Sequence, residues 1–402
     1  MAEMIDDSLM VTMNGDLCPG EMKEEDSPQH EVKEDSQSSL IQLMSAVSIG
    51  KTSETNVMSI IDWEEYFMSI AYLVANRSKD PSTQVGACIV NQRKRIVGQG
   101  YNGMPRGCSD DEFPWKKVGP DLETKYFYVC HAEMNAIFNK NCDDISNCTI
   151  YTILFPCNQC TKTIIQSGIS EVVYMCDKNK DKVEAIASMK MLDACNVRYR
   201  QLRPSWAGLN IDFKQGLCEI VKIGQSKSIP QPTTQQIDNT KKRQNCLPWD
   251  AYFLAISILV AKRSKCPEEQ LGACIVNEEK RIVGQGYNGM PQNSRNVFPW
   301  RTDSKNILEN KILYECHAEL NAILNANLQV KGCKLYTITF PCNECAKAII
   351  QSGIKEVIHL KKAEDKDTYV AAQIMFNAAK VTFRQHTPKD EMLYVDFSQI
   401  EL

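Results

Sequence analysis

The sequence contains a long internal repeat, and this repeat constrains the fold more than any other feature. Residues 84–105 match residues 270–291 at 19 of 22 positions, 186 positions apart. A period of this length indicates duplication of a whole domain rather than a solenoid of short units. A chain of 402 residues has room for two such domains and connecting segments. We therefore expect two similar domains.

The segments outside the repeat differ in composition. Residues 1–55 carry twelve acidic side chains and three lysines, a net charge of −9, so the remainder carries +5 because the whole chain has −4. Such an acidic, polar segment is typical of a disordered tail, and the Pro-, Gln- and Thr-rich stretch 223–245 is typical of a linker. We predict a tail over 1–58, a first domain over 59–222, a linker over 223–246 and a second domain over 247–402.

Several classes of protein do not fit this composition. No apolar run approaches the ~20 residues of a membrane span, so we expect no membrane partner. The acidic N-terminus does not resemble a secretory signal, and many of the 18 cysteines lie in apolar runs, which indicates reduced thiols and a cytoplasmic protein. The basic run 241–243 leaves nuclear import open, although a solvated linker is favoured. Without a basic stripe, nucleic acid is not an expected partner.

Within each copy, helical and strand patterns alternate. Residues 63–78 place apolar side chains at helical spacing, whereas residues 149–155 form a short apolar run typical of a buried strand. This alternation favours an α/β domain with helices covering a central sheet. In the first copy we predict helices over 63–78, 131–140 and 157–168, and strands over 87–90, 95–102, 149–155 and 171–175.

Histidine and cysteine recur with a spacing that suits a metal ion. His131 lies 26 residues before Cys157, and Cys160 follows at the start of a predicted helix, where a thiolate is favoured. Three protein ligands leave the fourth position of tetrahedral zinc to water, as in catalytic sites. A structural site would need a fourth ligand, and Cys130 is poorly aimed because neighbouring helical side chains diverge by ~100°. The predicted metal ligands are His131, Cys157, Cys160, His317, Cys342 and Cys345.

A glutamate follows each of these histidines at the same distance. Glu133 and Glu319 lie two residues after His131 and His317, beside the expected metal-bound water. A carboxylate at this place can move protons during the reaction. The combination of His-x-Glu with Pro-Cys-x-x-Cys is the signature of zinc-dependent nucleobase deaminases. We predict that Glu133 and Glu319 are catalytic.

Both copies resemble the deoxycytidylate (dCMP) deaminase family, over residues 62–215 and 248–397. The resemblance is carried in the first copy by RSKDPSTQVGACIVN, GYNGMPRGCSDDEFPW, TKYFYVCHAEMNAI and LFPCNQCTKTIIQSGI. It implies a three-layer α/β/α cytidine deaminase-like fold with a mixed five-stranded sheet, present twice. It also implies one Zn²⁺ per domain and the conversion of dCMP to dUMP and ammonia for thymidylate synthesis.

The resemblance extends to regulation and to ligand contacts. It implies activation by dCTP with Mg²⁺, inhibition by dTTP, and a homo-oligomer in which three chains supply six domains. The GYNG loops at 100–103 and 286–289 match the nucleotide-binding loop of the family. The predicted substrate or effector contacts are Arg77, Asn102, Gly103, Asp110, Asp111, Tyr126 and Asn288.

The second copy departs from the family pattern near the expected ligand. Asp80 is replaced by Cys266, and Val129 by Glu315, which adds a carboxylate that opposes an anionic substrate. We expect the first copy to act on dCMP, and the second to be a weaker deaminase or a regulatory partner. The alternatives are a dCTP deaminase, a polynucleotide cytidine deaminase, and a non-catalytic zinc-containing scaffold that senses nucleotides.

Overall fold

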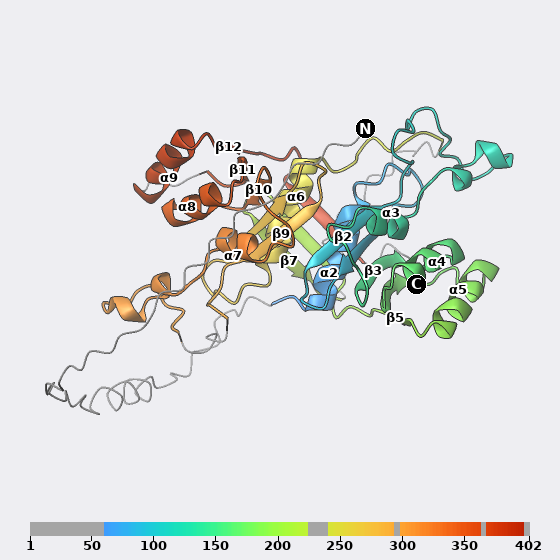
Figure 1. Cartoon of the computed structure of the whole chain (residues 1–402), viewed down its shortest axis with the longest axis horizontal. Helices are drawn as coiled ribbons and strands as arrows, with labels where there is room; N and C mark the ends of the chain where they lie inside the picture. Colours follow the sequence, from blue (N-terminus) through green and yellow to red (C-terminus); the bar gives the residue numbers. More distant parts are fainter. Residues whose placement is uncertain (1–59, 224–239, 293–297, 363–366, 398–402) are drawn as a thin grey trace, which may run out of the picture. The chain divides into compact units, whose positions relative to one another are not determined.

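The computed structural model describes residues 60–223, 240–292, 298–362 and 367–397. These residues belong to one compact unit that contains both repeats, which we call domain 1 and domain 2 (Figure 1). The predicted acidic tail and most of the predicted linker lie outside the described residues. The exact domain boundaries stay a prediction.

Each domain contains a mixed five-stranded sheet. In domain 1 the strand order is β2-β1-β3-β4-β5, with β1 antiparallel to its neighbours and β4 parallel to its neighbours. Domain 2 repeats this arrangement in the order β9-β8-β10-β11-β12. The strands are β1 (Gly86–Val90), β2 (Ile96–Tyr101), β3 (Thr149–Leu154), β4 (Glu171–Cys176), β5 (Arg198–Gln201), β8 (Gly272–Val276), β9 (Ile282–Tyr287), β10 (Lys334–Thr337), β11 (Glu356–His359) and β12 (Thr382–Gln385).

Helices cover both faces of each sheet, because successive strand residues point to opposite sides. In β1, Ala87 and Ile89 pack with α3, α4 and α5, whereas Cys88 and Val90 pack with α2. Domain 2 is built in the same way, so the predicted three-layer α/β/α fold is confirmed in both copies. The helices are α2 (Trp63–Ala75), α3 (Ala132–Phe138), α4 (Asn158–Gln166), α5 (Val183–Ala194), α6 (Trp249–Ala261), α7 (Ala318–Leu324), α8 (Asn343–Gln351) and α9 (Asp367–Ala378), with 3₁₀ turns η1 (Asp121–Glu123), η2 (Lys125–Phe127), η4 (Ile307–Glu309) and η5 (Lys311–Leu313).

The two domains share a hydrophobic core built around α2 and α6. Eleven of the 13 residues of each helix are buried, as expected for a helix that is apolar on all sides. The two helices pack against each other, and one continuous cluster of buried side chains joins them to the sheets of both domains. Neither these helices nor any other helix in the described ranges has the length and apolarity to cross a membrane.

A matched pair of arginine–tryptophan contacts closes the interface between the domains. The guanidinium carbon of Arg77 lies 4.1 Å from the ring centre of Trp249, and that of Arg263 lies 4.1 Å from the ring centre of Trp63. Each guanidinium also donates a hydrogen bond to a backbone carbonyl of the other domain. Cation–π contacts of this kind stabilise by about 0.5–2 kcal/mol each. The duplicated sequence therefore supplies both halves of a nearly two-fold interface.

A third, three-stranded sheet links the end of domain 2 to domain 1, and the sequence analysis did not predict it. Strand β13 pairs antiparallel with β6, which forms a hairpin with β7. In the register of this pairing, Leu393 lies opposite Ile211. The strands are β6 (Gly208–Asp212), β7 (Leu217–Val221) and β13 (Met392–Asp396).

Helix α3 lies unusually close to strand β2, and glycine makes this approach sterically possible. A Cβ atom on Gly100 would lie 2.2 Å from the backbone nitrogen of Ala136 and 2.4 Å from the carbonyl oxygen of Ala132. Gly286 has the equivalent contact in domain 2. The first glycine of each GYNG loop is therefore required by backbone packing, independently of any ligand.

We expect Gly100→Ala to lower the free energy of unfolding of domain 1 by about 1–3 kcal/mol, because the added methyl group overlaps the backbone of α3. Gly103→Ala is the matched control, since its Cβ would meet nothing nearer than the Tyr101 ring at 3.8 Å. Urea unfolding followed by circular dichroism measures both variants. Equal stability of the two variants would contradict this account of the packing.

Candidate active site

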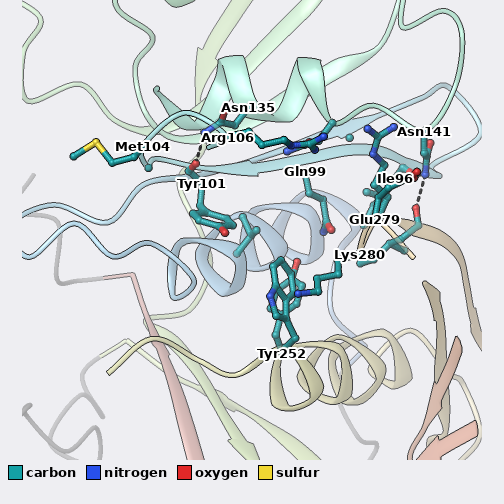
Figure 2. Close-up of a pocket in the computed structure, with 17 residues that line it drawn as sticks. Ile96, Gln99, Tyr101, Met104, Arg106, Asn135, Asn141, Tyr252, Glu279 and Lys280 are labelled. Atoms are coloured by element: carbon teal, nitrogen blue, oxygen red, sulfur yellow. Dashed lines mark hydrogen bonds between the residues drawn. The ribbon is translucent and has the colours of Figure 1, made fainter. Parts of the chain in front are cut away.

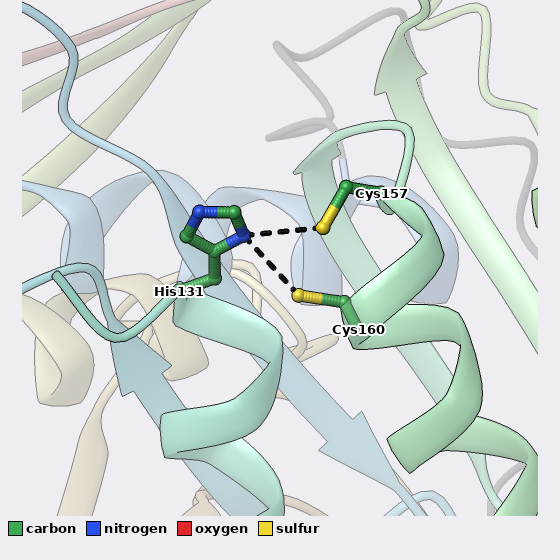
Figure 3. Close-up of side chains that lie close together, drawn as sticks. All are labelled: His131, Cys157 and Cys160. Carbon is green, nitrogen blue, oxygen red and sulfur yellow. Dashed lines mark hydrogen bonds between the residues drawn. The ribbon is translucent and has the colours of Figure 1, made fainter. Parts of the chain in front are cut away.

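The predicted metal ligands of each domain lie together. In domain 1, Nδ1 of His131 is 3.4 Å from Sγ of Cys157 and 3.3 Å from Sγ of Cys160 (Figure 3). The three donor atoms lie within 4.8 Å of one another, as do those of the corresponding group in domain 2. No other group of three or more His, Cys, Asp or Glu side chains within the described ranges meets this spacing.

The starts of two helices position these ligands. His131 is the N-cap residue of α3, and Cys157 is the N-cap residue of α4, so Cys160 lies in the first turn of the same helix. The exposed backbone N–H groups of a helix start favour negative charge. A side-chain hydrogen bond from Cys160, followed by contact with His131, lowers the pKa of Cys157 to about 3. The hydrogen bond with Cys157 in turn raises the pKa of His131 to about 9.

Two sulfur donors and one imidazole nitrogen are the donor set of a zinc site. Zinc accepts thiolate and imidazole ligands in tetrahedral geometry, and a set of three protein ligands is typical of catalytic sites. The low pKa of Cys157 favours the thiolate form that binds metal. The residues present in each domain therefore fit a zinc ion.

Glu133 lies beside this ligand group and is almost completely buried. Its carboxylate accepts a hydrogen bond of 3.4 Å from Oγ1 of Thr152 in β3, and Sγ of Cys160 lies 3.6 Å from its other oxygen. Burial raises the pKa of Glu133, because a low-dielectric environment disfavours the charged form. A carboxyl group with a raised pKa is suited to accept and return protons near neutral pH.

A cavity of about 310 Å³ lies over the ligand group of domain 1. His131, Glu133 and Cys157 contribute to it, together with the predicted contact residues Asn102 and Tyr126. Four lysines that the sequence analysis did not select also line it. They come from the loops and turns around the site, and they are Lys117, Lys125, Lys178 and Lys182.

A buried ion pair forms one wall of this cavity. The ammonium group of Lys125 pairs with the carboxylate of Asp80, which also accepts a hydrogen bond from Nδ2 of Asn102 at 3.1 Å. The side chains of Lys125 and Asp80 are 7% and 1% exposed. Burial lowers the pKa of Lys125, although Asp80 opposes this shift. Because the pair neutralises itself, the net cationic character of the cavity comes from the other three lysines.

The remaining predicted contacts of domain 1 lie elsewhere. Arg77 lies in the interface between the domains, over Trp249. Asp110 pairs with Lys79, and Asp111 pairs with Lys242 at 2.6 Å. These three residues do not line the cavity over the ligand group, and their roles toward a ligand stay predictions.

Gly103 lines a second cavity, which lies between the two domains. This cavity has a volume of about 280 Å³. Figure 2 shows Tyr101 and Arg106 of domain 1 on one side, and Tyr252 and Lys280 of domain 2 on the other. The GYNG loop of domain 1 thus does not serve one site alone, because Asn102 lines the cavity over the metal ligands while Gly103 lines this second cavity.

Domain 2 keeps the ligand group but surrounds it differently. Nδ1 of His317 lies 3.4 Å from each of the two cysteine sulfurs, and Glu319 accepts a hydrogen bond of 2.7 Å from Thr337. The predicted contact Asn288 is buried and donates to the carboxylate of Glu315 at 2.7 Å. The domain 2 site therefore has the same histidine, cysteine and glutamate groups beside an additional carboxylate.

Comparison with known proteins agrees with this geometry. A family model described as the cytidine and deoxycytidylate deaminase zinc-binding region matches residues 61–176 and 247–361. The two matches together cover more than half of the chain, and each contains one complete ligand group. The chain therefore belongs to the cytidine and deoxycytidylate deaminase family and carries the zinc-binding region of that family twice. The resemblance seen in the sequence and the duplication of the domain are both confirmed.

Individual relatives within this family carry a more specific name. Deoxycytidylate deaminase of Homo sapiens is 52% identical over 171 residues, which are 42% of this chain and 93% of the relative. The probable deoxycytidylate deaminase of Drosophila melanogaster is 52% identical over 159 residues, which are 38% of this chain and 78% of the relative. The crystal structure of dCMP deaminase from cyanophage S-TIM5 in complex with dCMP and dUMP has 24% identity and a TM-score of 0.28, and covers 35% of this chain and 96% of that chain.

We expect Asp80→Asn to lower the free energy of unfolding of domain 1 by about 3 kcal/mol, because it leaves the buried ammonium of Lys125 without a counter-charge. Lys116→Ala is the control, since the Lys116–Glu123 pair is exposed and its removal should change stability by less than about 1 kcal/mol. Urea unfolding measures both. Equal, small losses would show that the Asp80–Lys125 pair does not hold this wall of the cavity.

Proposed function

We propose that the chain is a deoxycytidylate deaminase that converts dCMP and water to dUMP and ammonia. The observation that carries this proposal is the joint arrangement of the His131–Cys157–Cys160 group with the buried carboxylate of Glu133 at the floor of a cavity. The names of the 52%-identical relatives support dCMP as the substrate.

Each residue of domain 1 has a distinct role in this proposal. His131, Cys157 and Cys160 would hold Zn²⁺, which supplies the Lewis acidity that makes water a nucleophile near neutral pH. Glu133 accepts a proton from the attacking water and delivers it to the neighbouring ring nitrogen. It then transfers the second proton of the water to the amino group, so that the carbon–nitrogen bond breaks and ammonia leaves. Thr152 orients the Glu133 carboxylate.

Lysine side chains give the cavity of domain 1 affinity for a phosphate. Lys117, Lys178 and Lys182 line it, while Lys125 is already paired with Asp80. An excess of ammonium groups raises the local concentration of an anionic substrate. The cationic lining of the cavity is consistent with a nucleotide substrate rather than an uncharged base.

Several finer properties belong to the same proposal. We propose one zinc ion per domain, regulation by dCTP with Mg²⁺ and by dTTP, and an assembly of three chains in the cytoplasm. The cavity between the domains supports an effector that carries phosphates, because Arg106, Lys280 and Arg281 contribute cationic groups to it.

We expect Glu133→Gln to lower kcat for dCMP by about 10²–10⁴-fold, because glutamine keeps the shape of the side chain but moves no proton. Glu319→Gln is the matched control in domain 2, and we expect it to retain most of the dCMP turnover. Ammonia release is the measurement. Equal halving of activity by the two variants would mean that both domains act on dCMP, and no turnover by the unmodified chain would overturn the proposed substrate.

A further inference from the structure

The catalytic groups of domain 2 are arranged as in domain 1. Cys345 lies 3.4 Å from the Glu319 carboxylate, against 3.6 Å for the corresponding pair in domain 1. Glu319 is 5% exposed and accepts a closer hydrogen bond from its threonine than Glu133 does. Nothing in the geometry of this centre separates the chemistry of the two domains. A difference in function must therefore come from the residues that recognise the rest of the substrate.

One wall of the domain 2 site keeps the asparagine–lysine–carboxylate cluster but moves the carboxylate to another position. In domain 1 the partner of Asn102 and Lys125 is Asp80. In domain 2 the position of Asp80 is occupied by Cys266, and Glu315 replaces Val129. Glu315 now accepts the hydrogen bond from Asn288 and lies 3.5 Å from Lys311. The exchanges of Asp80 for Cys266 and of Val129 for Glu315 thus keep a carboxylate in the cluster but place it at a different position in the site.

This relocation places negative charge where domain 1 has an apolar side chain. Val129 lines the cavity over the metal ligands of domain 1. Its counterpart Glu315 is 9% exposed, only two residues from His317. Because this side chain is buried, water screens its charge weakly.

The neighbouring positions change the charge in the same direction. Lys311 donates to Sγ of Cys266 at 2.9 Å and lies 3.1 Å from a second carboxylate, that of Glu268. Thr302 replaces the cavity lysine Lys117 and donates to Glu268 at 2.9 Å. Burial alone would lower the pKa of Lys311, but its thiol and carboxylate neighbours raise it. The ammonium group of Lys311 therefore already contacts one thiol and two carboxylates of the protein.

Counting formal charges at these matched positions shows the size of the change. In domain 1, Lys117 and Lys125 with Asp80 give +1. In domain 2, Lys311 with Glu268 and Glu315 gives −1. The positions that correspond to Lys178 and Lys182 fall in or next to residues 363–366, which lie outside the described residues. The Glu315 side chain is 9% exposed and that of Glu268 is 45% exposed, so water screens this negative charge only in part, and the charge opposes the binding of an anionic phosphate.

We propose that domain 2 is a nucleoside deaminase, which accepts an uncharged cytosine nucleoside and excludes nucleotides. The proposal rests on the zinc-dependent cytosine deamination proposed above, and adds that the two domains divide substrates by charge. The step is the same in both domains, with water as the only co-reactant and ammonia as the leaving group. The determinant of specificity is the Glu268–Lys311–Glu315 group, and the reaction of Glu319 is unchanged.

The first test uses the full chain with domain 1 inactivated by Glu133→Gln. We expect this variant to release ammonia from deoxycytidine with a kcat/KM about tenfold or more above that for dCMP, because the charge at the site opposes the phosphate. In the chain with Glu319→Gln the preference should be reversed. A Glu133→Gln chain that prefers dCMP would overturn the proposal.

The second test exchanges the determinants. Adding Cys266→Asp, Glu268→Ser and Glu315→Val to the Glu133→Gln chain gives Lys311 the single carboxylate partner that Lys125 has in domain 1 and changes the formal charge at these positions from −1 to 0. This variant should shift the preference toward dCMP by about tenfold. Lys347→Ala is a control for altered surface charge, because the Lys347–Glu344 pair is exposed. Unchanged preference in the exchange variant that folds, as judged by thermal unfolding, would overturn the assignment of the determinant.

A binding measurement covers the case in which domain 2 turns over slowly. The Glu133→Gln, Glu319→Gln double variant keeps all the predicted metal ligands but should not turn over substrate. Calorimetry with this variant measures the number of binding sites and the affinity for deoxycytidine and for dCMP. We expect one site per chain for each ligand. Two equal dCMP sites, or no nucleoside site, would overturn the inference. Failure of the unmodified chain to deaminate dCMP would instead overturn the function proposed for domain 1, so the two failures are distinguishable.

Discussion

The burial of α2 against α6 is the packing interaction on which the rest of the structure depends. Each helix covers one face of its own sheet and is itself covered by the other domain. Separation of the domains would expose large buried aromatic side chains such as Tyr66, which meets Gln285, and Tyr252, which meets Gln99, at a cost of about 25 cal/mol for each Å² of apolar surface. The arginine–tryptophan contacts and the pairing of β13 with β6 act on the same interface. The two domains therefore stabilise each other.

A duplicated domain in a single chain can change in one copy while the other retains the original activity. The predicted metal ligands and the two glutamates lie at the starts of α3, α4, α7 and α8, and both copies contain them. Among the residues that differ between the copies, Glu315 takes the place of Val129, which lines the cavity of domain 1. Substrate recognition can thus change without disturbing the catalytic centre.

The sequence predicted the parts of the structure that depend on local pattern or on repeated chemistry. Patterns of apolar residues located helices α2, α3 and α4 and strands β1 to β4 of domain 1, whereas α5 and β5 were not among the predicted elements. The spacing of His131, Cys157 and Cys160 located the candidate metal site. It did not predict the pairing of β13 with β6, because pairing between strands so distant in the chain leaves no local signal. The ion pair of Lys125 with Asp80 was also missed. The sequence did contain a signal for this lysine, because Lys125 recurs as Lys311 at the same spacing at which His131 recurs as His317.

The central claim is that the His-Cys-Cys group and Glu133 form a zinc-dependent catalyst for dCMP. Its most direct test is to measure zinc content and ammonia release from dCMP on the same sample, before chelation, after chelation and after zinc is returned. The account predicts about one zinc per domain, loss of turnover with the metal, and recovery when zinc is restored. Full turnover of dCMP after the zinc has been removed, or a zinc-loaded chain that leaves dCMP unchanged, would contradict it.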